Sequence, residues 1–168
     1  MNYEIEHLHA DPEEEQLAIA QLIEDYTHGK LDETPQMLPV TVAEVMSKHI
    51  ALRAKVNNTF AGFIGAISPV ARHNQPMSEI GTLWVPKTFR GNGIAFNLIK
   101  AAQAELAQQG ITSFAFGNPG SEPIFKAAGF SIALCSELPT NVFEACANCP
   151  AKPLTGCCDQ PLIYRENQ

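Results

Sequence analysis

The stretch VPKTFRGNGIA, residues 85–95, lies between an apolar segment that predicts a strand and a long segment with helical spacing. Gly91 and Gly93 allow the backbone to turn tightly and let a ligand oxygen approach it closely. The N–H groups in the first turn of a helix lack intrahelical acceptors, and the helix dipole is positive there, so a pyrophosphate is a natural ligand. Arg90 adds one positive charge. The alternative is an ordinary glycine-rich turn that opens a helix.

Two known nucleotide-binding motifs do not fit this turn. A dinucleotide-binding fingerprint needs a third small residue where Phe96 stands, and an acidic residue on the next strand. A Walker loop needs Gly-Lys followed by Ser or Thr, which the sequence lacks. The turn therefore predicts an anion site of another class.

The segments around the turn predict the order β-α-α-β-β-β-α-β-α-β-β, which indicates an α+β fold with a mixed sheet. The first helix is expected to begin at Asp11 as its N-cap, and the second after Thr41. Asn57-Asn58 predicts a hairpin turn, whereas 71–76 is expected to be a loop. The remaining expected strands are 3–8, 51–56, 60–67, 80–85, 111–116, 130–134 and 162–165, and the remaining expected helices are 93–109 and 121–128.

Composition narrows the functional classes. The chain has 168 residues, 45% of them apolar, which suits one globular domain. Its net charge of −7 disfavours nucleic acid as a partner, because phosphate neutralisation drives that binding. No apolar run is long enough to span a membrane, and the first residues are acidic rather than basic and apolar. We therefore expect a cytoplasmic protein, monomeric or homodimeric.

Two motifs together indicate a family. Residues 85–95 resemble the acyl-CoA loop of the GNAT superfamily of N-acyltransferases, R/Q-x-x-G-x-G/A. Residues 118–130, NPGSEPIFKAAGF, are similar in spacing to that family's N-x-x-A-x-x-x-Y-x-K-x-G-F segment. The resemblance covers residues 3 to about 134. It implies that 1–136 form a GNAT acyltransferase domain, and 137–168 a Cys-rich extension packed on it that contains the last strand.

The resemblance also implies a reaction, namely acetyl transfer from acetyl-CoA to a primary amine of a small molecule or peptide by direct attack in a ternary complex. The end of the strand before the turn would bind the pantetheine arm, and the N–H groups of the turn would bind the pyrophosphate. Instead of binding the cofactor, Trp84 could pack in the core, and Asn118 could simply stabilise a turn. The residues implied to bind the cofactor are Leu83, Trp84, Val85, Arg90, Gly91, Asn92, Gly93, Ile94, Ala95, Asn118 and Phe125.

Two positions decide the expected chemistry. Glu79 resembles the catalytic Glu of histone-type family members and is the candidate base that removes the amine proton, with an exposed edge residue as its alternative. Phe125 stands where the family usually has a Tyr that protonates the leaving thiolate, and Phe has no proton to give. Either the thiolate leaves unassisted, or another hydroxyl such as that of Ser121 substitutes, or the protein is an acyl-CoA-binding sensor with little turnover.

Four cysteines gather near the C-terminus: Cys146, Cys149, Cys157 and Cys158. A Cys-x-x-Cys turn is half of a typical tetrahedral zinc site, so a structural zinc is one expectation. Adjacent residues such as Cys157 and Cys158 rarely both coordinate one ion, so Cys135 or Asp159 could replace Cys158 as a ligand. Reduced thiols without a ligand and a redox pair are the alternatives.

The tail is also weakly similar to those of N-acetylglutamate-synthase-like GNAT proteins, which would make an amino acid the acceptor. Its carboxylate would need a cation, for which Arg53, Arg72 and Lys87 are candidates. His73 either reaches the acceptor pocket or is an exposed loop residue.

Overall fold

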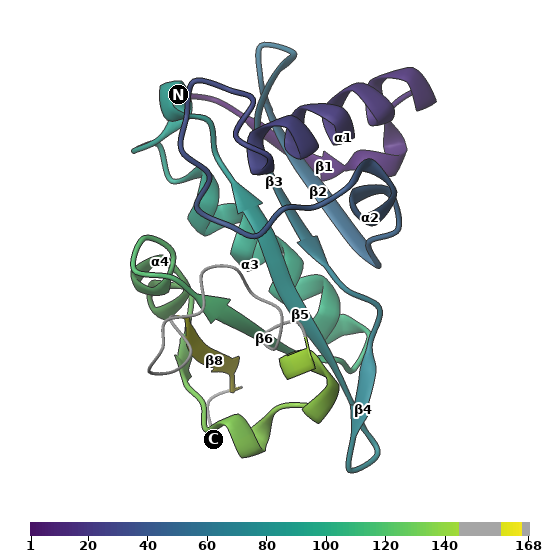
Figure 1. The fold of residues 1–168 in the computed structure, drawn as a ribbon, viewed down its shortest axis with the longest axis vertical. Coiled ribbons are helices and arrows are strands. Elements are labelled where there is room, and N and C mark those ends of the chain that lie inside the picture. Colours follow the sequence, from purple (N-terminus) through teal and green to yellow (C-terminus); the bar gives the residue numbers. More distant parts are fainter. Residues whose placement is uncertain (145–158, 166–168) are drawn as a thin grey trace.

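The computed structural model describes residues 1–144 and 159–165, which form one mixed sheet with helices on both faces (Figure 1). The strands are β1 (Glu4–His7), β2 (Ile50–Val56), β3 (Thr59–Ala66), β4 (Val70–Arg72), β5 (Gln75–Trp84), β6 (Thr112–Gly117), β7 (Phe130–Ile132) and β8 (Gln160–Tyr164). The helices are α1 (Glu13–Thr27), α2 (Val42–Met46), α3 (Ile94–Gln108) and α4 (Glu122–Ala127), with short 3-10 helices between some elements.

The strand order β1-β2-β3-β5-β6-β8-β7 confirms the predicted α+β fold with a mixed sheet. β5 and β6 are parallel, and the other neighbouring strands are antiparallel. In Figure 1, β5 runs through the middle of the molecule, with α3 behind the sheet and with α1 and α2 in front of it. The expected last strand is present as β8, and it lies between β6 and β7 rather than at an edge.

Burial on both faces explains why the central strands are apolar without alternation. On one face, α3 packs its buried residues against β2, β3, β5 and β6; those residues are Ile94, Leu98, Ile99, Ala102 and Leu106. On the other face, Ile19, Ile23 and Tyr26 of α1 pack against Phe63 and Trp84. None of the helices within 1–144 and 159–165 is long and apolar enough to span a membrane.

The loop expected at 71–76 is wrong. β4 and the start of β5 form a hairpin there, in which Val70 pairs with Met77 and Arg72 with Gln75. His73 and Asn74 both have positive φ, at 48° and 64°, which is the backbone of a type I′ hairpin turn. The sequence signal was weak because the turn lacks glycine and because Pro76 disfavours a strand, although an edge tolerates it.

Asp11 is not the N-cap of α1, since Pro12 takes that position and Asp11 binds cations of β2 instead. The carboxylate of Asp11 accepts from Arg53 Nε at 2.9 Å and Nη2 at 2.8 Å, and from Lys55 Nζ at 3.1 Å. Arg53 is 3% exposed and also donates to Glu6 at 2.6 Å. The network fastens β1, β2 and the start of α1 to one another.

The hydrogen bond from Arg53 lowers the pKa of Asp11 to about 2, from an ordinary 3.8. Because the folded-state pKa is the lower one, this ion pair stabilises the fold fully above about pH 4. The stabilisation is lost as the pH falls through about 2.

We expect Asp11→Asn to lower the free energy of unfolding by about 3 kcal/mol at pH 7, because it leaves the buried Arg53 without its main partner. Urea denaturation at pH 7 and at steps down to pH 3 measures this, and the difference from wild type should shrink as the pH falls. The control Glu6→Gln removes a half-exposed partner and should cost less than about 1 kcal/mol. Equal losses for the two variants would contradict the prediction.

Candidate functional site

The central feature of the site is an opening between β5 and β6. The two strands pair only from Met77 to Glu79 of β5, opposite Thr112 to Phe114 of β6. Beyond Glu79, β5 continues to Trp84 with no strand of residues 1–144 or 159–165 paired to it on this side, while the rest of β6 pairs with β8 on its other side. The backbone polar groups that face the opening are available to water or to a ligand.

A bulge in β5 lies beside this opening. Phe63 and Gly65 of β3 pair with Trp84 and Gly81 of β5, so β5 contains one more residue than β3 over this stretch. Thr82, within the bulge, has φ 52°, which is unusual for a β-branched residue. The extra residue and the left-handed backbone change the direction in which the N–H groups of β5 point.

The glycine turn has the predicted backbone. Gly91 and Gly93 both have φ 77°, and Gly93 is the N-cap of α3. Nothing lies within 4 Å of a Cβ placed on Gly91, so the backbone conformation rather than space requires glycine there. The side-chain amide of Asn92 donates to the carbonyls of Phe89 and Arg90, both at 3.1 Å, and stabilises the turn. The first turn of α3 thus leaves its N–H groups directed away from the helix.

The loop between α1 and α2, residues 28–41, crosses in front of the sheet (Figure 1) and contacts two of the predicted cofactor residues. Arg90 donates through Nε to Val85 O at 2.9 Å, and its guanidinium forms an ion pair with Glu33. Asn118 donates from Nδ2 to the carbonyl of Gln36 at 2.6 Å. A hollow of about 410 Å³ is lined by the loop and by Lys87 of the segment after β5; the loop residues are Gly29, Leu31, Asp32, Glu33, Thr34 and Pro35.

Glu79 lies where the opening begins. Burial raises the pKa of Glu79, Lys48 opposes this rise, and the Asp159 carboxylate adds to it. Oε1 of Glu79 is 3.4 Å from the position that a Cβ on Gly81 would occupy, so the carboxyl lies alongside β5. A carboxyl with a raised pKa at the start of an opening is suited to accept a proton from a bound ligand.

Two aromatic residues of the predicted cofactor set belong to the core. Trp84 is 4% exposed and stacks on Tyr26, with ring centroids 4.3 Å apart. Phe125 is 2% exposed and packs edge-to-face on Phe130 at 5.2 Å. Leu83 and Ala95 are half-buried, and the turn from Arg90 to Gly93 is exposed. The structure therefore brings the turn, the end of β5 and Asn118 around one opening, while the two rings pack in the cores on opposite faces of the sheet.

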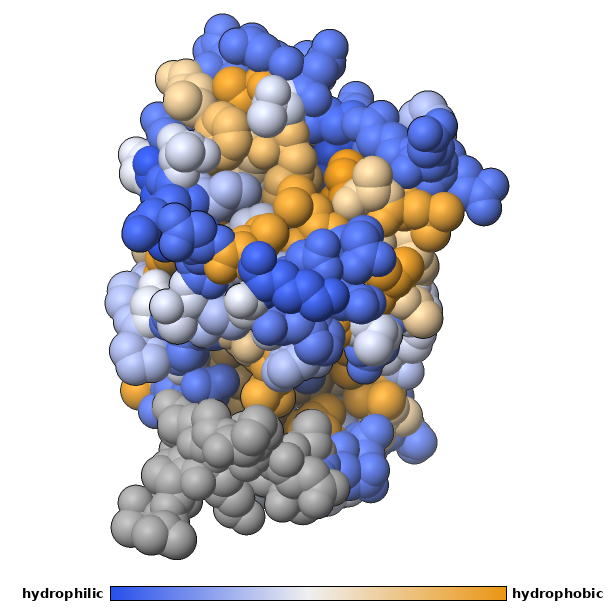
Figure 2. All heavy atoms as spheres, turned by 45° about the horizontal axis from the view of Figure 1, so that its top comes forward, coloured by the Kyte–Doolittle hydropathy of each residue, from blue (hydrophilic) through white to orange (hydrophobic). Residues whose placement is uncertain are grey.

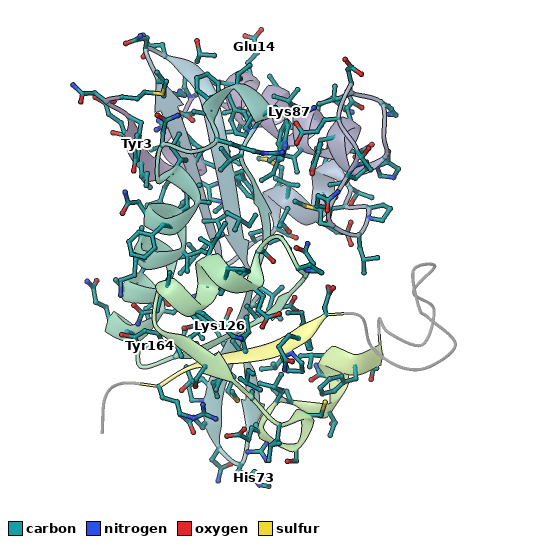
Figure 3. All side chains as sticks on the ribbon, turned by 90° about the vertical axis from the view of Figure 1, so that its left-hand side faces the viewer. Tyr3, Glu14, His73, Lys87, Lys126 and Tyr164 are labelled. Carbon is teal, nitrogen blue, oxygen red and sulfur yellow. The ribbon has the colours of Figure 1, made fainter. Side chains whose placement is uncertain are left out.

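Two of the three cationic side chains considered for an acceptor carboxylate already have partners in the structure. Arg53 is neutralised by Asp11 and Glu6, and Arg72 donates to the carbonyl of Ser136. Figure 3 shows His73 at the tip of the β4–β5 hairpin, at the opposite end of the molecule from Lys87. A cation missed by sequence reasoning is Lys48, which follows α2 and whose charge affects Glu79. No local pattern marks Lys48, because its position follows from how α2 packs on the sheet.

The four predicted zinc ligands lie in 145–158, outside the described residues. Cys135 is exposed and free, and the described ranges contain no group of three or more His, Cys, Asp or Glu that could hold a metal ion. The zinc site thus stays a prediction.

Residues 4–130 match the model of the acetyltransferase (GNAT) family, so the chain belongs to this family. No curated protein matches the chain in sequence. Among solved structures, it is similar to the N-acetylglutamate synthase of Neisseria gonorrhoeae, in complex with coenzyme A and N-acetyl-glutamate. That match has 17% identity and a TM-score of 0.68, and it covers 100% of this chain and 36% of the synthase.

Two smaller proteins resemble the chain over most of their length. A GNAT acetyltransferase of Staphylococcus aureus Mu50 has 12% identity and a TM-score of 0.66, with 97% of this chain and 98% of that one covered. A GNAT acetyltransferase of Brucella melitensis in complex with acetyl-CoA has 14% identity and a TM-score of 0.59, with coverages of 99% and 91%. At such identities, the three structures support the fold.

We expect Thr82→Gly to raise the free energy of unfolding by roughly 1 kcal/mol, because glycine adopts the positive φ without strain. The control is Thr59→Gly, at a β3 position without positive φ, which should lower it by about 1 kcal/mol. Urea denaturation measures both. Equal destabilisation by the two substitutions would show that Thr82 is not strained.

Proposed function

We propose that the chain transfers an acetyl group from acetyl-CoA to the primary amine of a small molecule, with amino acids as one candidate class, or of a peptide. The observation that carries this proposal is the opening between β5 and β6, which begins at Glu79 and has the glycine turn beyond the end of β5. Membership of the acetyltransferase family supports the reaction type. The complex of the Brucella melitensis relative with acetyl-CoA supports the cofactor.

In the proposed complex, the N–H groups of residues 91–95 bind the pyrophosphate, together with the charge of Arg90. The backbone of Leu83 to Val85 pairs with the pantetheine arm along the open edge of β5. Asn118 contacts the arm from the end of β6. Trp84 supports this site from the core under α1 and Phe125 from the core under α3, as their burial suggests.

The chemistry follows from these positions. Glu79, directly or through a water molecule, removes a proton from the acceptor ammonium, and the neutral amine attacks the thioester carbonyl. A C–N bond forms, and a backbone N–H of Leu83 to Val85 stabilises the oxyanion. The C–S bond then breaks, the attacking nitrogen releases its remaining excess proton to solvent, and the thiolate, whose conjugate acid has a pKa near 8.5, leaves and takes a proton from solvent. Protonation of the leaving thiolate therefore needs no hydroxyl at position 125.

The direct test is acetyl transfer from acetyl-CoA to a mixed pool of amino acids, polyamines, aminoglycosides and peptides, read by mass spectrometry. One acetylated amine supports the proposal. A second candidate function, an acyl-CoA sensor, is favoured by the absence of a hydroxyl on Phe125. Acetyl-CoA binding by calorimetry without any acetylated product would support the sensor.

We expect Glu79→Gln to lower kcat/KM by about 10²- to 10⁴-fold, because the amide cannot accept the proton. The raised pKa of Glu79 predicts a fall in wild-type kcat/KM as the pH drops, at a pH above the ordinary 4.5 of a glutamate. Profiles of kcat/KM against pH should lose this limb in the variant. The exposed control Glu4→Gln should match wild type, and a Glu79→Gln enzyme with wild-type rates at every pH would exclude Glu79 as the base.

The loop 28–41 has to release two groups before the cofactor binds as proposed, because Glu33 holds Arg90 and the carbonyl of Gln36 holds Asn118. We expect Glu33→Gln to tighten coenzyme A binding about twofold to fivefold, because it frees Arg90 from a competing ion pair. Calorimetric titration with coenzyme A measures this. Glu13→Gln, at the exposed start of α1, is the matched control, and weaker binding by Glu33→Gln would contradict the competition.

A further inference from the structure

A patch of bare backbone lies beside Glu79. Gly65 of β3 and Gly81 of β5 are directly paired, so neither contributes a side chain to the face of the sheet that α1 and α2 cover. Glu79 lies two residues before Gly81 and therefore on the same face. Its Oε1 is 3.4 Å from where a Cβ on Gly81 would be, which places the carboxyl at the margin of the patch.

Lys48 lies at the other margin of this glycine patch. It follows α2, and its Cγ and Cδ are each 3.0 Å from where a Cβ on Gly65 would be, so its stem lies flat on the glycine. Any side chain at position 65 would displace it. Lys48 also lines a hollow of about 230 Å³ with Glu44, Ser47, Ile67 and Ser68.

Lys48 and Glu79 have opposite charges but remain apart. Within residues 1–144 and 159–165, no carboxylate oxygen lies within 4.0 Å of Lys48 Nζ, so Lys48 forms no ion pair there. Burial lowers the pKa of Lys48, while the charges of Glu79 and Glu44 raise it. Lys48 is therefore a partly buried cation without a directly bound anion, and the partly buried carboxyl of Glu79 lies across the glycine patch from it. A ligand that carries both a negative and a positive charge would complete this arrangement.

We propose that Lys48 binds the carboxylate of the acceptor, and that the acceptor is therefore an α-amino acid. The inference rests on the proposed function, in which Glu79 receives the proton of the acceptor amine. An amino acid presents an ammonium and a carboxylate on one carbon, and Gly65 and Gly81 place no side chain of their own between Lys48 and Glu79. An amino acid amide or a polyamine would leave Lys48 without its partner.

The test compares kcat/KM for α-amino acids with that for the matching α-amino acid amides. Lys48→Met keeps the apolar stem that packs on Gly65 and removes the charge. We expect it to lower kcat/KM at least tenfold for the acids and less than threefold for the amides. Lys48→Arg should retain most of the preference for acids, and the control Lys100→Met, on α3 at the opposite face of the sheet, should behave as wild type.

A purely electrostatic effect of Lys48 on Glu79 gives a different result. Removing the cation would then shift the low-pH limb of kcat/KM to higher pH for amino acids and amino acid amides alike. The ratio of kcat/KM between the two kinds of substrate would not change, and that outcome overturns the inference. Turnover of amides or polyamines in preference to amino acids also overturns it, while the proposed function stands.

Binding measured without turnover separates the two proposals. Protein saturated with coenzyme A is mixed with the twenty common amino acids, and binding is detected by ligand-observed NMR. An amino acid that binds the wild type and Lys48→Arg but not Lys48→Met supports the inference, even if no acetylated product forms and the proposed function fails. If no amino acid binds the wild type, the inference is overturned.

Discussion

β5 and β6 share backbone hydrogen bonds only as far as Glu79, and the rest of the candidate site depends on where this pairing ends. β6 continues with β8 as its partner, while β5 passes through the bulge at Thr82 toward the glycine turn. Both strands are held on their other sides, so the edges that face the opening stay apart. Buried backbone groups need partners, and this requirement makes the opening a natural place for an extended ligand to bind.

The loop 28–41 connects the core under α1 to this opening. Its ends are fixed: the hydroxyl of Thr27 accepts from Val40 N at 3.1 Å, and Glu24 accepts from Val42 N at 2.5 Å. Between these points, Glu33 and Gln36 bind Arg90 and Asn118 at the opening, while Leu31, Met37 and Val40 pack against the core under α1. Figure 2 shows apolar and hydrophilic side chains side by side on this face of the molecule. Water or ligand groups can replace such polar contacts at little cost, in contrast to the stacking of Tyr26 on Trp84 beneath.

The order of elements and the glycine turn were predictable from the sequence because their signals are local. Gly91 and Gly93 adopt the positive φ that makes glycine necessary, and Thr41 caps α2 with a reciprocal hydrogen bond to Glu44, as its position before the helix indicates. The hairpin at 70–77 was missed because its turn uses His73 and Asn74, which carry a weaker local signal. Asp11 was misassigned because a helix cap and a buried ion pair draw on the same carboxylate, and the choice depends on Arg53 in a distant strand.

Local signals in the sequence suffice to specify an α+β fold with a glycine turn before a long helix, since backbone preferences and hydrophobic spacing act over a few residues. Which charges are neutralised and which remain available depends instead on contacts made in the folded chain. The register of β3 against β5 places Gly65 opposite Gly81, and the packing of α2 lays Lys48 across that glycine. Burial and the proximity of opposite charges shift the pKa values of Glu79 and Lys48, and both effects depend on contacts between residues far apart in the chain.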